Sequence, residues 1–146
     1  MSPTDVIEAV ADKIAELWPE RIIYRTFCPG EHQRPSCFLY LTKAEAKNAN
    51  IGLVRWEMEA EAELFSSTDH YDASSTEELR REQMSVLEAF GGPGLAVGDR
   101  TVSVQALADG AEAGSAYVRF SFEWMDVRPG YQESDQQKME HYELHT

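Results

Sequence analysis

Apolar and charged residues alternate along one long segment of the chain, from Leu53 to Phe65. The apolar positions of this segment are Val54, Trp56, Met58, Ala60, Ala62 and Leu64. The charged positions are Arg55, Glu57, Glu59, Glu61 and Glu63. Met, Glu and Ala favour helices, but on a helix these carboxylates would spread around the cylinder and leave no apolar face. The period of two therefore predicts a long strand with one buried face and one strongly acidic face.

Two other segments have the period of a helix. Within residues 4–18 the apolar residues fall in one arc of about 120°, and Pro19 ends the segment. A capping box at Ser75-Thr76-Glu77-Glu78 predicts the start of a second helix, and the glycines and proline of residues 91–94 predict its end. The apolar face of this second helix consists of Leu79, Val86, Leu87 and Phe90.

Four shorter segments predict strands, because they are β-branched or alternate with period two: residues 21–26, 37–42, 101–106 and 116–124. Residues 43–50 are polar and ambiguous, apart from a turn at 48–50, and residues 109–114 predict the turn of a closing hairpin. The fold class is therefore α+β, with an antiparallel or mixed sheet of about five strands, two helices on one face, and the order α-β-β-β-α-β-β. We expect a single domain over residues 1–128, followed at 129–146 by an acidic, flexible arm that orders on a partner.

The net charge of the chain disfavours several classes of binding partner. The 146 residues include 26 Asp and Glu against 13 Lys and Arg, which gives a formal net charge of −13. Such a chain repels phosphate, so specific nucleic-acid binding and binding to anionic membranes are both disfavoured. No apolar run reaches the roughly 18–20 residues of a membrane-spanning helix, and the first residues lack the features of a secretion signal. We therefore expect a cytoplasmic protein that is neither secreted nor bound to a membrane.

Several residues were candidates for chemistry. On a strand, neighbouring members of the acidic set Glu57, Glu59, Glu61 and Glu63 would lie about 6.5–7 Å apart, which suits a catalytic pair of carboxylates. Four carboxylates in a row on one face are, however, typical of a solvated sheet surface. Asp69, His70, Tyr71 and Asp72 place a histidine among acids, as in a metal or acid–base site. A plain surface loop, which could contact a partner, explains them far better.

The two cysteines leave three alternatives. Cys28 and Cys37 could remain reduced, pair as a disulfide across a hairpin, or bind a metal together with His32. Two cysteines are too few for a four-cysteine zinc site. From the residues alone we expect no catalytic, metal or cofactor site, and hence no enzyme.

Several strings resemble the phage tail terminator proteins, in particular a small family from prophages of Gram-positive bacteria. The similar strings are Val6-Ile7-Glu8-Ala9-Val10, Leu17-Trp18-Pro19, Ile23-Tyr24, Ser36-Cys37-Phe38-Leu39, the long strand at 54–64, and Val118-Arg119-Phe120-Ser121-Phe122. The resemblance spans about residues 4–127. It implies a structural tail-completion protein that forms a ring, commonly a hexamer, on the head-proximal end of the tail tube.

The resemblance also implies partners and a location. The ring would stop tube polymerisation and give the head-completion (neck) protein a docking face, so its partners would be further copies of itself, the tail tube protein and the neck protein. DNA would pass through the ring without specific binding. The protein would occur in the host cytoplasm during assembly and then in the virion tail. Two alternative functions stay open: another head–tail connector or minor capsid protein, and a small acidic binding or inhibitor module.

An acidic channel would let DNA pass, because Lys and Arg would bind its phosphates. We therefore hypothesise that the face of Glu57, Glu59, Glu61 and Glu63, or the acidic arm, lines the channel. The alternative is that this face only keeps the free subunit soluble. The loops at 28–37 and 66–74, which include Asp69, His70, Tyr71 and Asp72, would contact the tube and the neck.

Overall fold

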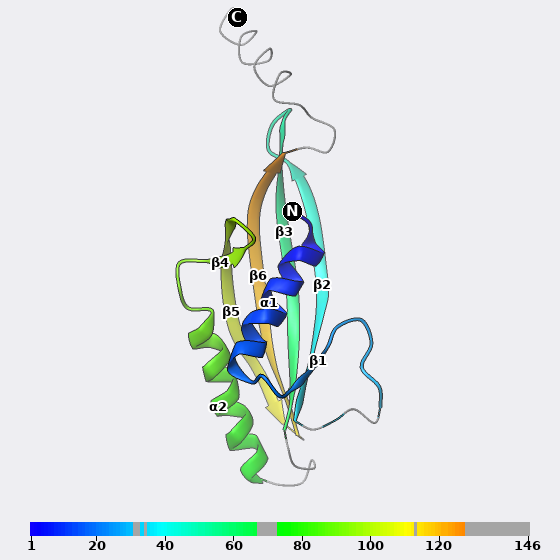
Figure 1. Ribbon diagram of the computed structural model, residues 1–146, viewed down its shortest axis with the longest axis vertical. Helices are drawn as coiled ribbons and strands as arrows, with labels where there is room; N and C mark the ends of the chain where they lie inside the picture. Colours follow the sequence, from blue (N-terminus) through cyan, green and yellow to red (C-terminus); the bar gives the residue numbers. More distant parts are fainter. Residues whose placement is uncertain (31–32, 34, 67–72, 113, 128–146) are drawn as a thin grey trace, which may run out of the picture.

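The alternating segment is one of the two central strands of a six-stranded sheet (Figure 1). The computed structural model describes residues 1–30, 33, 35–66, 73–112 and 114–127. The elements are α1 (Pro3–Leu17), β1 (Ile22–Tyr24), β2 (Ser36–Asn48), β3 (Leu53–Phe65), α2 (Ala73–Ala89), β4 (Leu95–Val97), β5 (Arg100–Glu112) and β6 (Ser115–Val127). The sheet order is β1-β2-β3-β6-β5-β4, and among the strands that these residues form only β1 and β2 pair in parallel. The α+β prediction is confirmed, with one strand more than expected.

The bounds of β3 are those that the alternation predicts, and one set of its side chains is buried. Ala60 and Ala62 lie opposite Phe120 and Val118 of β6, and all four are fully buried. Small residues on one strand therefore leave room for larger ones on the next, which is how a closely packed core is filled. The tertiary fold overrides local helix propensity here, because the apolar face of β3 is buried in the core, where it contacts α2.

Helix α1 begins at Pro3, one residue before the predicted start, and Ser2 is its N-cap. Ser2 Oγ accepts a hydrogen bond from the Asp5 backbone N–H at 3.3 Å, and the Asp5 carboxylate accepts one from the Ser2 N–H at 2.8 Å. These hydrogen bonds lower the pKa of Asp5. Helix α2 instead begins at Ala73, two residues before the expected N-cap. The capping box at Ser75 is therefore wrong, because an N-cap residue has a non-helical backbone and Ser75 is already helical.

Two strands extend well beyond their predicted bounds, and one short strand was not predicted. Strand β2 continues through the ambiguous residues 43–48, and β5 continues through residues 109–112, where a turn was expected. Both extensions pair with a neighbouring strand, so partners distant in sequence decide their conformation. Gly110 is accommodated in an irregularity between Ala108 and Ala111, and the turn itself uses Gly114 at φ 82°. Strand β4 was missed because three residues are too short to show a period.

Both helices pack on the same face of the sheet, here called the covered face. Helix α1 contacts β2 towards one edge and β4 at the other, while α2 contacts β3, β5 and β6 (Figure 1). The sheet thus curls around α1. The opposite face, here called the open face, is the convex side and carries no helix among the described residues.

Candidate functional site

The acidic row of β3, Glu57, Glu59, Glu61 and Glu63, lies on the open face. Its side chains are half-buried rather than fully solvated, because β2 and β6 flank them on both sides. The pairing of strands brings further charged residues to the same face. The acidic ones are Glu45, Asp109 and Glu123, and the basic ones are Lys43, Lys47, Arg55 and Arg119. Acidic side chains thus outnumber basic ones on the open face.

One end of the row, at Glu57, is paired with basic side chains. Glu57 accepts from Lys47 Nζ at 3.0 Å and lies 3.3 Å from Arg55 Nη2. Arg55 Nε is also 3.7 Å from Glu123 on β6. The hydrogen bond from Lys47 lowers the pKa of Glu57, and the same bond raises the pKa of Lys47. The ion pairs therefore hold both groups charged at neutral pH.

The other end of the row is flanked by tyrosines. Tyr117 Oη donates to Glu63 at 3.1 Å, and Tyr40 lies opposite Glu61 on β2. Burial, together with the neighbouring glutamates, raises the pKa of both tyrosines, so their hydroxyls stay protonated and act as donors. The Phe38 ring contacts Tyr40 with centroids 4.7 Å apart. This end of the open face is thus partly aromatic.

A shallow hollow of about 230 Å³ lies in the middle of the open face. Its lining includes Lys43, Glu59, Gln105 and Ser121, all of which come from different strands. A hollow made of strand side chains on a convex surface is open to solvent. Its form suits contact with another macromolecule better than enclosure of a small molecule.

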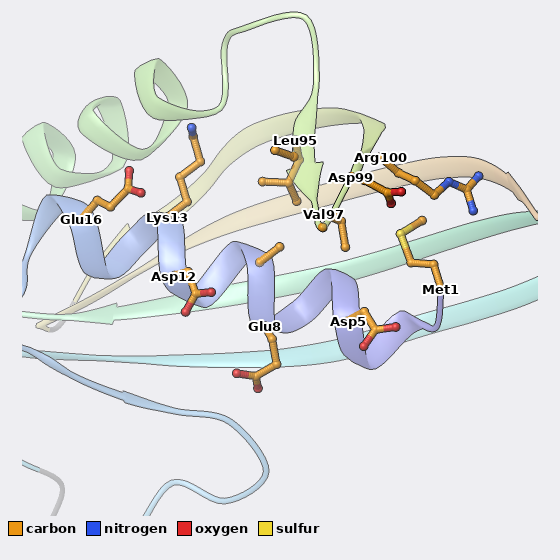
Figure 2. A pocket seen from close by; sticks show the side chains of 13 residues that line it. Met1, Asp5, Glu8, Asp12, Lys13, Glu16, Leu95, Val97, Asp99 and Arg100 are labelled. Carbon is orange, nitrogen blue, oxygen red and sulfur yellow. The ribbon is translucent and has the colours of Figure 1, made fainter.

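A second acidic surface, which the sequence does not predict, lies between α1 and the β4–β5 hairpin (Figure 2). The groove has a volume of about 630 Å³, and Leu95 and Val97 are buried between the hairpin and α1. Its acidic lining residues are Asp5, Glu8, Asp12, Glu16 and Asp99, and its basic ones are Lys13 and Arg100. The groove depends on β4, so helical periodicity in α1 could not have revealed it.

A buried ion pair joins the segment after α1 to α2. Arg21 Nη2 pairs with Glu82 Oε1, and the two side chains are only 11% and 9% exposed. The Arg21 guanidinium also stacks 4.3 Å above the Trp18 ring. Arg21 Nη1 and Glu82 Oε2 are buried, and neither has a partner among the residues that the structure describes. The pair links residues 61 positions apart, which no local pattern could have predicted.

The two cysteines are free thiols. Burial raises the pKa of Cys37 to about 12, and burial also raises the pKa of the half-buried Cys28. Neither thiol is therefore activated as a nucleophile. His32 lies outside the described residues, and within those residues no group of three or more metal-ligating side chains comes together.

The expected contact loop, Asp69, His70, Tyr71 and Asp72, and the arm at 129–146 also lie outside the described residues. In the part of the chain that is described, no helix is both long and apolar enough to cross a membrane.

Comparison with known proteins adds no functional name. No protein-family model matches the chain, and no curated protein matches it. Among solved structures, 26 chains match. One of these, which carries no functional name, has a TM-score of 0.41 and 15% sequence identity over 91% of this chain and 99% of its own. At that level the likeness carries no argument about function.

Proposed function

We propose that this chain is the subunit of a ring that caps the head-proximal end of a phage tail tube, stops its polymerisation and gives the neck protein a docking face. The observation that carries the proposal is the open face, a broad sheet surface with an excess of carboxylates and no helix over it among the described residues. The similar strings named above support it, since they fall in α1, β1, β2, β3 and β6, which build the core of the fold.

The charge arrangement of the open face suits a wall that DNA passes. Basic side chains occur there, but Lys47 and Arg55 pair with Glu57, and Arg119 pairs with Asp109 at 3.0 Å. Basic side chains that are paired with carboxylates are less available to neutralise the phosphates of DNA, and the remaining glutamates repel these phosphates. In the proposed ring, this face lines the channel and DNA slides along it without being held.

Tube assembly tests the capping function. Purified tube protein from the same phage or prophage would be polymerised with and without the full-length chain, and tube lengths measured by negative-stain microscopy. We expect short tubes with a ring of added density at one tip. Unlimited growth at a stoichiometric excess of the chain would contradict capping, and uniform decoration along the tube would point to another connector protein.

A charge-reversed pair tests the channel assignment. The Glu59→Lys/Glu61→Lys variant should still cap tubes, but its capped tips should retain double-stranded DNA in a salt-dependent manner. The matched control is Asp12→Lys/Glu16→Lys, which makes the same charge change on the exposed side of α1. Equal DNA retention by both variants would contradict a channel position for the open face and leave capping untouched.

A further inference from the structure

Both edges of the sheet are covered at one end only. On one side, β1 pairs with no more of β2 than Ser36–Phe38. On the other side, β4 pairs with no more of β5 than Arg100–Val102. Strand residues beyond these short covers have a neighbour on one side only, as far as the described residues extend. Such edges present unpaired backbone donors and acceptors and are templates for another strand.

The free stretch of β5 is limited at its other end as well. Gln83 Nε2 of α2 donates to the carbonyl oxygens of Asp109 at 3.1 Å and Gly110 at 3.4 Å. The uncovered stretch of the β5 edge is therefore residues 103–108, and the uncovered stretch of the β2 edge is residues 39–47. These two stretches lie on opposite edges of one sheet and have comparable lengths.

The directions of the two edge stretches suit pairing between copies. Strand β2 is antiparallel to β3, β3 to β6, and β6 to β5, so β2 and β5 run in opposite directions (Figure 1). Two copies placed side by side in the same orientation therefore bring β2 of one against β5 of the next as an antiparallel pair, the geometry that is more stable per residue.

The rows of the sheet place compatible side chains opposite one another. When the register is followed from β2 through β3 and β6 to β5, Tyr40 lies in the same row as Leu107, and Leu41 lies in the same row as Ala106. If the second copy is not shifted along the strand direction, residues of one row face each other across the contact. By the same register, Lys43 shares a row with Gln105 and Glu45 with Ser103. Each charge therefore meets an uncharged polar residue, each large apolar residue meets another apolar or aromatic one, and no like charges are opposed.

The apolar side of a hollow at the β5 edge matches an exposed side chain at the β2 edge. The hollow, of about 540 Å³, is apolar on the side of the covered face, where it is lined by Leu87 and Phe90 at the end of α2 and by Val104 and Ala106. Towards the open face its lining is mixed and consists of Gln105, Leu107, Arg119 and Ser121. Leu107 is 58% exposed. Leu41 of β2 is 44% exposed, lies on the covered face and shares a row with Ala106. Leu87 and Phe90 line the hollow on this same face of the sheet.

We propose that copies of this chain associate edge to edge, with residues 39–45 of β2 in one copy paired antiparallel to residues 103–108 of β5 in the next and Leu41 seated against Leu87 and Phe90. The contact is heterologous, so each copy keeps one free edge until a ring closes or a filament continues. The inference deepens the proposed function and rests on it for ring closure. The irregularity of β2 between Leu41 and Lys43 and the two lysines of this edge restrict pairing to a matched partner.

Disulfide trapping tests the contact at residue level. In a Cys28→Ser background, one full-length chain carries Leu41→Cys and another carries Ala106→Cys. Directly opposed residues of an antiparallel pair have Cα atoms about 4.5–5.5 Å apart, within the range of a disulfide. We expect the mixture to give a cross-linked dimer at the highest concentration that the protein tolerates. No cross-link in the mixture, or an equal cross-link with either variant alone, would overturn the edge pairing.

A surface substitution checks the apolar contact without threatening the fold. Leu41→Asp should weaken self-association, measured by analytical ultracentrifugation, by about tenfold or more, because an exposed leucine that becomes buried contributes on that scale. The control is Ile51→Asp at the tip of the β2–β3 turn, an exposed apolar residue (58%) outside the contact, which should leave association unchanged. Equal weakening by both, or by neither, would overturn the contact.

These measurements separate the two proposals. A chain that caps tubes but shows no cross-link between Leu41→Cys and Ala106→Cys keeps its function and loses this interface. A chain that cross-links at these positions but leaves tube growth unlimited keeps the interface and loses the capping function.

Discussion

The two faces of the sheet are built from the same strands and differ in what stabilises them. On the covered face, β3 and β6 contribute fully buried residues such as Ala60, Val118 and Phe120, which pack against two helices. On the open face, the alternate positions of the same strands carry Glu57, Glu63 and their partners. Burial of apolar area is large and insensitive to salt, whereas exposed ion pairs are weak and screened.

The comparison separates stability from recognition. The covered face supplies most of the free energy of folding, so the open face is free to carry charges whose net effect on stability is small. A surface that contributes little to folding can be fitted to a partner, and the excess of carboxylates on the open face is a feature of that kind. The predictions below test whether the two faces divide these roles.

The largest difference in unfolding free energy is expected between substitutions at two adjacent residues that lie on opposite faces of β6. Phe120→Ala should lower the free energy of unfolding by about 3–5 kcal/mol, because it leaves a cavity beneath the helices where Phe120 contacts the Phe90 ring at 4.9 Å. Ser121→Ala, one residue along and exposed, should change it by less than about 0.5 kcal/mol. Urea unfolding of both variants measures the difference, and similar losses would break the division between faces.

The buried ion pair and an open-face pair should also differ. Arg21→Met leaves the Glu82 carboxylate buried without its partner, which should cost about 3 kcal/mol of unfolding free energy. Most of that loss should return in Arg21→Met/Glu82→Leu, since the uncompensated charge is then gone. Lys47→Met, which breaks the exposed pair with Glu57, should shift the urea midpoint little. A larger shift for Lys47→Met than for Arg21→Met would contradict this ordering.

The buried thiol on the covered face should make folding sensitive to alkaline pH. The pKa of Cys37 is raised from 9.0 to about 12 by burial, so the folded state favours the neutral thiol. Stability is unaffected below the unfolded pKa and falls as pH rises from about 9 towards about 12, because only the unfolded chain ionises there. By pH 10 the loss should be about 1 kcal/mol relative to Cys37→Ala. Parallel slopes for the two proteins between pH 8 and pH 10 would contradict the assignment.

The smallest effect is expected at a hydrogen bond of the open face. Tyr117→Phe removes the hydroxyl that donates to Glu63 while the ring keeps its packing. The unfolding free energy should fall by about 1 kcal/mol. Thermal unfolding measures it, with Tyr24→Phe as a control outside the acidic row, since the Tyr24 hydroxyl accepts from the Gln33 backbone N–H instead. A loss as large as that of Phe120→Ala would place Tyr117 in the core and not on a recognition surface.

The candidate site was only partly accessible from the sequence. The acidic row and its common face follow from the alternation at residues 53–65, because period two places Glu57 and Glu63 on one side of any strand. The partners of the acidic row cannot be predicted from the sequence, because Lys47 and Tyr117 lie beside it only as a result of the register in which β2 and β6 pair with β3. The groove beside α1 depends in the same way on β4.

The sequence by itself determined the elements whose pattern is local: the apolar face of α1, the bounds of β3, and the presence of a closing hairpin. Only the tertiary structure decided the full lengths of β2 and β5, the parallel pairing of β1, and the meeting of Arg21 with Glu82. The reason is physical. Periodicity reports which side of an element is buried, whereas partners distant in the chain are chosen by strand register and helix packing, which no short window of residues contains.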